Sequence, residues 1–96
     1  MNGTPGLERI SSVWQVVWGE VNGNPSKPIT RKKVQTGVGN IPEAAVLGCL
    51  ISFVGEGLIK CVNDKGEDFD PKKNSDYDVF RLTHKGSSMG NLYTKT

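Results

Sequence analysis

One long apolar stretch, residues 40–60, most constrains how this chain of 96 residues folds. It begins with helix signals, because Asn40 and Glu43 have the spacing of a capping box and Pro42 fits a first turn. Gly57 supplies the stop, since glycine readily adopts the left-handed conformation that ends helices. A surface helix has one apolar stripe, whereas this segment is apolar around most of its circumference. The sequence predicts a helix from Asn40 to Gly57 with an unusually apolar outer face.

The composition fits one small domain. With 35% hydrophobic residues the chain is globular, and a net charge of +2 is too small to indicate nucleic acid or an anionic membrane by itself. No apolar run reaches the roughly 18 residues of a membrane helix, and the N-terminus lacks the pattern of a signal peptide. Cys49 and Cys61 are expected as buried or half-buried thiols in a reducing cytoplasm. We expect residues 1–96 to form a single cytoplasmic domain with flexible ends at 1–6 and 87–96.

Two further helices are predicted before the long one. Apolar residues recur at spacings of three and four through residues 7–22, which predicts a helix there. Trp14 and Trp18 lie one turn apart on it, either as core residues or as an exposed platform for a partner. A turn-rich segment ends this helix, and Thr30 then caps a short helix over residues 31–37.

Two strands are predicted after the long helix. Residues 58–62 are apolar and partly β-branched, and residues 77–82 nearly alternate in polarity. The polar loop over residues 63–75 has no periodicity, so we expect the strands to pair antiparallel across it. The tail that follows either docks as a short helix or frays. Its apolar residues are Met89, Leu92 and Tyr93.

Two short motifs in this order of elements resemble those of small winged-helix transcriptional regulators. Residues 56–59, EGLI, resemble the sequence that closes the third helix in that family, and residues 79–86, VFRLTHKG, resemble its YRLT-x-KG sequence at the end of the wing. The resemblance implies an α+β winged helix-turn-helix fold, with three helices, a two-stranded antiparallel wing and a short C-terminal tail. It also implies a DNA-binding regulator whose third helix lies in the major groove.

Candidate contacts to double-stranded DNA come from three places. A basic cluster opens the second helix, two lysines and an arginine lie in the wing region, and the third helix offers one polar outward residue. These candidates are Arg31, Lys32, Lys33, Lys72, Lys73, Arg81 and Ser52. An ordinary solvated surface is the alternative for the basic cluster. The remaining outward positions of the third helix lack polar side chains and weaken a DNA-reading role. They are Ala44, Ala45, Leu47, Gly48, Cys49 and Ile51.

The apolar outer face of the third helix favours a second function, protein–protein association. Two copies of the helix can bury Leu47, Ile51 and Val54 against each other, which predicts a homodimer, and a hetero-oligomer is the alternative. Trp14 and Trp18 form a second candidate interface. The C-terminal tail is the other candidate cover for the helix.

Neither an enzyme nor a cofactor is predicted. His84, the single histidine, falls in the first turn of a helix, where exposure is expected. No base is placed by sequence to activate either cysteine, and no set of residues has metal-ligand spacing.

Overall fold

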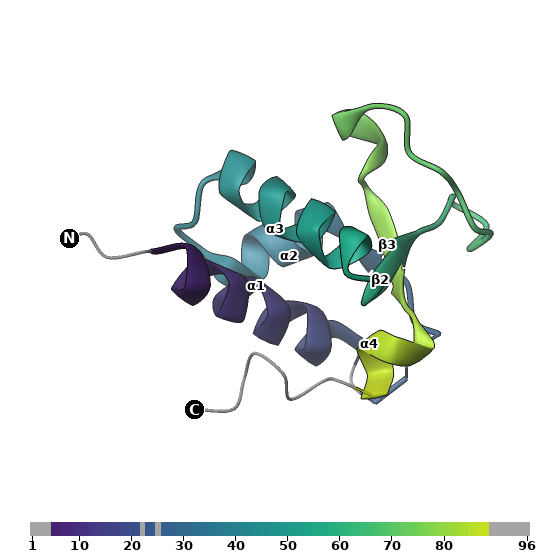
Figure 1. Ribbon diagram of the computed structural model, residues 1–96, viewed down its shortest axis with the longest axis horizontal. Helices are drawn as coiled ribbons and strands as arrows, with labels where there is room; N and C mark the ends of the chain where they lie inside the picture. The colour runs from purple at the N-terminus through teal and green to yellow at the C-terminus, as the bar shows by residue number, and fades with distance from the viewer. Residues whose placement is uncertain (1–4, 22, 25, 89–96) are drawn as a thin grey trace.

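The computed structural model describes residues 5–21, 23–24 and 26–88, with side chains from residue 9 onward (Figure 1). The chain has an α+β fold. Its elements in order are α1 (Pro5–Val21), β1 (Ile29–Thr30), α2 (Arg31–Val38), α3 (Glu43–Gly55), β2 (Ile59–Cys61), the short 3-10 helix η1 (Asn74–Asp76), β3 (Val79–Leu82) and α4 (His84–Ser88). The predicted first and second helices are confirmed as α1 and α2, within one or two residues at each end.

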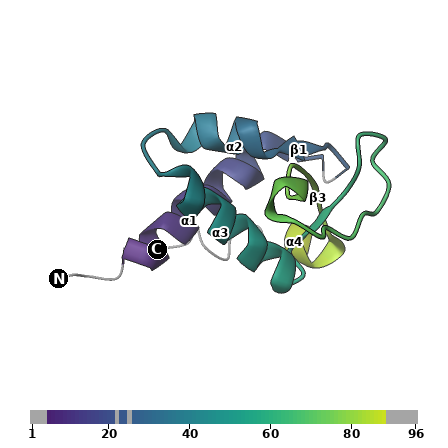
Figure 2. The same cartoon turned by 90° about the horizontal axis from the view of Figure 1, so that it is seen from above.

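The three longer helices form one end of the molecule and the sheet forms the other (Figures 1 and 2). α1 packs against both α2 and α3, and α3 leads directly into the sheet through β2. The long loop between β2 and β3 projects beyond the helices (Figure 1).

The sheet has three strands, so the predicted number of two is wrong. The predicted antiparallel pairing of β2 with β3 is confirmed, and β1 adds a second antiparallel partner on the other side of β3. Ile29 is buried and pairs with Phe80, while Thr30 pairs with Val79. A strand of two residues is too short to show an alternating pattern, which is why the sequence did not predict it.

Thr30 connects the sheet to the helices without an intervening loop. It ends β1 and also caps α2, because its hydroxyl accepts a hydrogen bond from the Lys33 N–H at 3.1 Å. The predicted cap is therefore confirmed. The next amide, Arg31 N–H, donates to the Asp78 carbonyl at 2.8 Å, so the first turn of α2 is also bonded to the chain just before β3.

The two ends of α3 differ in how well the sequence predicted them. The capping box of Asn40 and Glu43 is absent, because α3 begins at Glu43 and Pro42 occupies the cap position with no side-chain bond. The C-terminal stop is confirmed: Gly57 has a φ of +77°, and the Leu58 N–H reaches back to the Phe53 carbonyl at 2.9 Å. This Schellman geometry turns the chain sharply into β2.

The core lies where α1, α3 and the sheet meet. Trp14 is fully buried and meets Phe53 edge to face, with ring centroids 5.1 Å apart. Val46, Leu50 and Phe53 form the buried face of α3, and Cys49 joins them. Aromatic pairs of this kind add about 0.5–1.5 kcal/mol beyond the area they bury.

The two motifs that resemble winged-helix sequences meet at Thr83. The Thr83 hydroxyl donates to the Gly57 carbonyl, with the Leu58 carbonyl as a further acceptor, and accepts from the Gly86 N–H at 3.0 Å. That last bond caps the first turn of α4, and the two motifs form one packed corner.

The predicted flexible ends fall mostly beyond these elements. Residues 5–6 already belong to α1 and residues 87–88 to α4, and the rest of both segments lies outside the described residues, as do Met89, Leu92 and Tyr93. The helices of the described part include none with the length and apolarity needed to cross a lipid bilayer.

Candidate protein interaction surface

The outer face of α3 carries an apolar stripe. Ala44, Leu47, Ile51 and Val54 are spaced three, four and three residues apart, so they follow one side of the helix. We call these four residues the α3 stripe. Ala44 is exposed and the other three are half-buried. Val54 packs against the core, whereas Leu47 and Ile51 belong neither to the core nor to the described side chains packed on it.

The α3 stripe is bordered by positions without bulky or charged side chains. Gly48 and Gly55 are exposed and open, with no atom within 4 Å of a Cβ built at either position. Ser52 is exposed, and the only charged residue of the helix is Glu43 in its first turn. Cys49, predicted to face outward, is instead only 8% exposed, because it turns with Leu50 toward the core.

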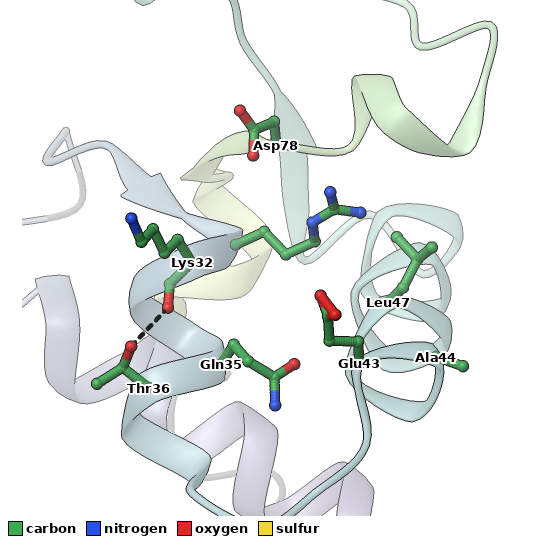
Figure 3. A pocket seen from close by; sticks show the side chains of 8 residues that line it. Lys32, Gln35, Thr36, Glu43, Ala44, Leu47 and Asp78 are labelled. Carbon is green, nitrogen blue, oxygen red and sulfur yellow. Dashed lines mark hydrogen bonds between the residues drawn. The ribbon is translucent and has the colours of Figure 1, made fainter.

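A groove lies at the N-terminal end of the α3 stripe. Its volume is about 660 Å³, and it opens between α2, α3 and the chain just before β3. Figure 3 shows Lys32, Gln35 and Thr36 on the α2 side, Glu43 and Leu47 on the α3 side and Asp78 above them. Arg31 and Ala44 complete the lining. We call this hollow the α2–α3 groove. It is lined by two cations and two acids, so its formal charges balance.

Phe69 lies at the opposite end of the α3 stripe. Among the large hydrophobic residues of the described part of the chain, Phe69 is the most exposed, with 40% of its surface accessible to solvent. Phe69 and Val54 line the same shallow hollow, together with Pro71. Its amide donates to the Cys61 carbonyl at 3.0 Å, which holds the loop beside β2. Sequence reasoning missed this residue, although it is the one aromatic of an otherwise polar loop.

Asp68, the residue before Phe69, holds the loop against the sheet through two ion pairs. The Asp68 carboxylate lies 3.0 Å from Lys60 Nζ and 3.4 Å from an Arg81 guanidinium nitrogen, and Lys60 and Arg81 pair across β2 and β3. Arg81, a predicted DNA contact, is thus already engaged by a carboxylate. Asp68 remains 71% exposed, so these bridges contribute little stability.

The other basic candidates gather more closely than their sequence positions suggest. The Arg31 guanidinium donates to the Asn74 carbonyl at 3.5 Å, which brings the start of α2 to η1. Lys72 and Lys73 immediately precede η1, and their amides donate to the Asp76 carboxylate. Lys32 and Lys33 are exposed on α2, as are Lys72 and Lys73. Ser52 lies on the exposed side of α3 and lines a different hollow, together with Ala45 and Cys49, so the structure does not bring it into this cluster.

The two tryptophans have different environments, although the sequence presents them as a pair. Trp14 has no exposed surface, so it has no area to contribute to the predicted interface. Trp18 is half-buried and stacks on Trp14 with ring centroids 6.4 Å apart. The tryptophan pair is therefore mainly a core feature.

The buried thiols show no sign of activation. Burial raises the pKa of Cys49, although the nearby Arg9 charge opposes the shift. Burial also raises the pKa of Cys61, and the negative charges of Asp70 and Asp76 raise it further. A reactive thiol has a lowered pKa. Within the described residues there is also no group of three or more acidic, histidine or cysteine side chains placed to hold a metal ion.

Compared with known proteins, the chain matches no family model, no curated protein and no solved structure.

Proposed function

We propose that this chain is a winged-helix module that self-associates through the α3 stripe. The order α1, β1, α2, α3, β2, β3 and the sheet order β1-β3-β2 support the winged-helix assignment. The corner at Thr83, where the two motifs meet, also supports it.

The observation that carries this function is the character of the outer face of α3. In a winged helix that reads DNA, this face supplies cations and hydrogen-bond donors for phosphates and base edges. In this chain the outer face of α3 presents Leu47 and Ile51, whose side chains do not pack in the core. Its first turn carries Glu43, whose charge repels phosphate.

The energetics favour a modest, reversible association. Full burial of an aliphatic side chain contributes about 1.5–3 kcal/mol, and Leu47, Ile51 and Val54 are already half-buried. Two copies of the α3 stripe therefore contribute several kcal/mol, part of which offsets the entropy lost on association. We expect an equilibrium between monomer and dimer that depends on protein concentration.

Sedimentation velocity over a concentration series tests this function. The wild-type chain should shift from monomer to dimer as concentration rises, and Ile51→Glu should remain monomeric because it places a charge in the α3 stripe. Ser52→Glu is the matched control, since Ser52 is exposed and lies outside the stripe. A wild-type chain that stays monomeric throughout, or equal effects of the two variants, would contradict the proposal.

Binding of duplex DNA is the second candidate function. It is favoured by the Arg31–Asn74 bond, which gathers the basic residues of α2 with Lys72 and Lys73. Phosphate contacts of this kind predict an affinity that falls steeply with salt. The test is retention of a mixed-sequence duplex at low salt by the wild type and by a Lys32→Ala/Lys33→Ala variant. A duplex that the wild type fails to retain would rule this candidate out.

A further inference from the structure

We infer that two copies of this chain pair their α3 stripes antiparallel about a twofold axis, and that Phe69 of each copy enters the α2–α3 groove of the other. This inference rests on the proposed self-association and adds its geometry. It follows from three observations: the spacing of the α3 stripe, the positions of Phe69 and the groove at its opposite ends, and the distribution of charge.

The spacing of the α3 stripe is that of the contact positions in a coiled coil. Steps of three, four and three residues match the a and d positions of a heptad repeat. Ala44 and Ile51 occupy the a positions, and Leu47 and Val54 occupy the d positions. In an antiparallel pair the two types face each other, so Leu47 meets Ile51 of the partner subunit. By the same register Ala44 meets Val54 of the partner subunit. The small Ala44 thus opposes a larger side chain, which leaves room for a neighbour of Val54.

Phe69 is that neighbour. It shares a hollow with Val54 at the C-terminal end of the stripe, whereas Ala44 and Leu47 line the α2–α3 groove at the N-terminal end. Bringing Val54 to Ala44 of the partner subunit therefore brings Phe69 to the mouth of the groove. The twofold axis repeats the contact, so both exposed aromatic side chains are covered. A parallel pair would instead place Phe69 against its own copy and leave both grooves empty.

The charges favour the same orientation. Asp70 follows Phe69 directly and is exposed, and Arg31 and Lys32 line the groove that Phe69 enters. Glu43 and Asp78 also line the groove, and Lys60 in the hollow beside Phe69 is already paired with Asp68 of the same hollow. An antiparallel pair places Asp70 beside Arg31 and Lys32 at each end. A parallel pair would bring Glu43 next to its own copy.

Disulfide trapping tests the orientation. Leu47→Cys and Ile51→Cys are prepared separately, then mixed and oxidised in the full chain. The antiparallel pair predicts a covalent dimer in the mixture and little in either variant alone. The wild type is the control for its own cysteines, which are buried. Covalent dimers formed mainly within each separate variant would indicate a parallel pair and overturn the inference.

A charge exchange tests the contact between Phe69 and the groove. Phe69→Ala should raise the dimer dissociation constant about tenfold or more, as expected for a buried aromatic at an interface. Asp70→Arg should weaken the dimer, and Arg31→Asp in the same chain should restore it, because the two charges exchange places. Asp64→Arg is the matched control, since it makes the same charge change elsewhere in the loop.

These outcomes separate the inference from the proposed function. If Ile51→Glu dissociates the dimer while Phe69→Ala and Asp70→Arg leave it intact, self-association through the α3 stripe stands and the antiparallel Phe69 contact is wrong. If the wild type is monomeric at every concentration, both are wrong. Restoration by the double charge exchange, together with trapping only in the mixture, establishes the contact.

Discussion

Gly86 in α4 packs so closely on the carbonyl of Leu58 that a Cβ atom at position 86 would overlap the carbonyl oxygen. Backbone atoms cannot move aside as a flexible side chain can. The contact explains why glycine follows the Thr83 cap at this spacing. It joins α4 to the residue that leads α3 into β2.

Gly86→Ala should therefore lower the free energy of unfolding by about 1–3 kcal/mol, the usual cost of overpacking a close contact. Urea denaturation followed by circular dichroism measures it. Gly19→Ala is the matched control, because Gly19 lies in α1 and a Cβ there meets no atom within 4 Å. The control should gain up to about 1 kcal/mol from better helix propensity. Equal stability of the two variants would contradict the close contact.

Thr83→Val should also destabilise the chain, by about 1–3 kcal/mol. The substitution keeps the shape of the side chain but removes the hydroxyl that bonds the Gly57 carbonyl and caps Gly86. Thr83→Ser retains the hydroxyl and should recover most of the loss. Hydrogen exchange of the Gly86 amide provides a second measurement, since it should accelerate in the valine variant and stay near wild type in the serine variant.

Trp14 and Trp18 should differ strongly in what they contribute to stability. Trp14→Ala should cost about 3–5 kcal/mol, because the side chain is fully buried against Phe53. Trp18→Ala should cost clearly less, since Trp18 is half-buried. Thermal unfolding of both variants checks the order. A loss at Trp18 as large as that at Trp14 would show that the two are equivalent core residues.

Stability should decline at alkaline pH because of the two buried thiols. Burial raises the pKa of Cys49 and of Cys61 in the folded chain. Below the ordinary thiol pKa of about 8.5, folded and unfolded chains both hold neutral thiols, and this contribution is fully present. Above it the unfolded chain releases its protons first, so the free energy of unfolding falls with rising pH until the folded thiols also ionise.

The measurement is the slope of unfolding free energy against pH, with Cys61→Ala as the comparison. The cavity left by Cys61→Ala lowers the free energy of unfolding at every pH, so only the slopes are compared. The variant should show a shallower decline above about pH 8.5. An unchanged slope would assign the decline to other groups.

Local signals in the sequence predicted the helices well. Thr30 and Gly57 mark helix ends through chemistry that depends only on neighbouring residues, and both predictions hold in the structure. The Asn40 cap failed for a similar local reason, because the helix starts at Glu43 behind Pro42. A capping pattern alone does not fix which residue begins the helix.

Features that depend on distant contacts were harder to predict. β1 exists because Ile29 reaches Phe80, about half the chain away, and its two residues carry no pattern of their own. The α2–α3 groove likewise needs α2, α3 and the start of β3 together. The sequence placed Leu47, Ile51 and Val54 on one face of a helix, but only the fold places Phe69 at the end of that face.

Thr30 has a consequence for how the molecule opens. Thr30 pairs with Val79 in the sheet, and its hydroxyl also accepts a hydrogen bond from the Lys33 amide in the first turn of α2. Separation of β1 from β3 therefore also frays the helix start, and the Arg31 amide loses the Asp78 carbonyl in the same event. In hydrogen exchange, the amides of Arg31 and Lys33 should behave as part of the edge of the sheet rather than as the end of a helix.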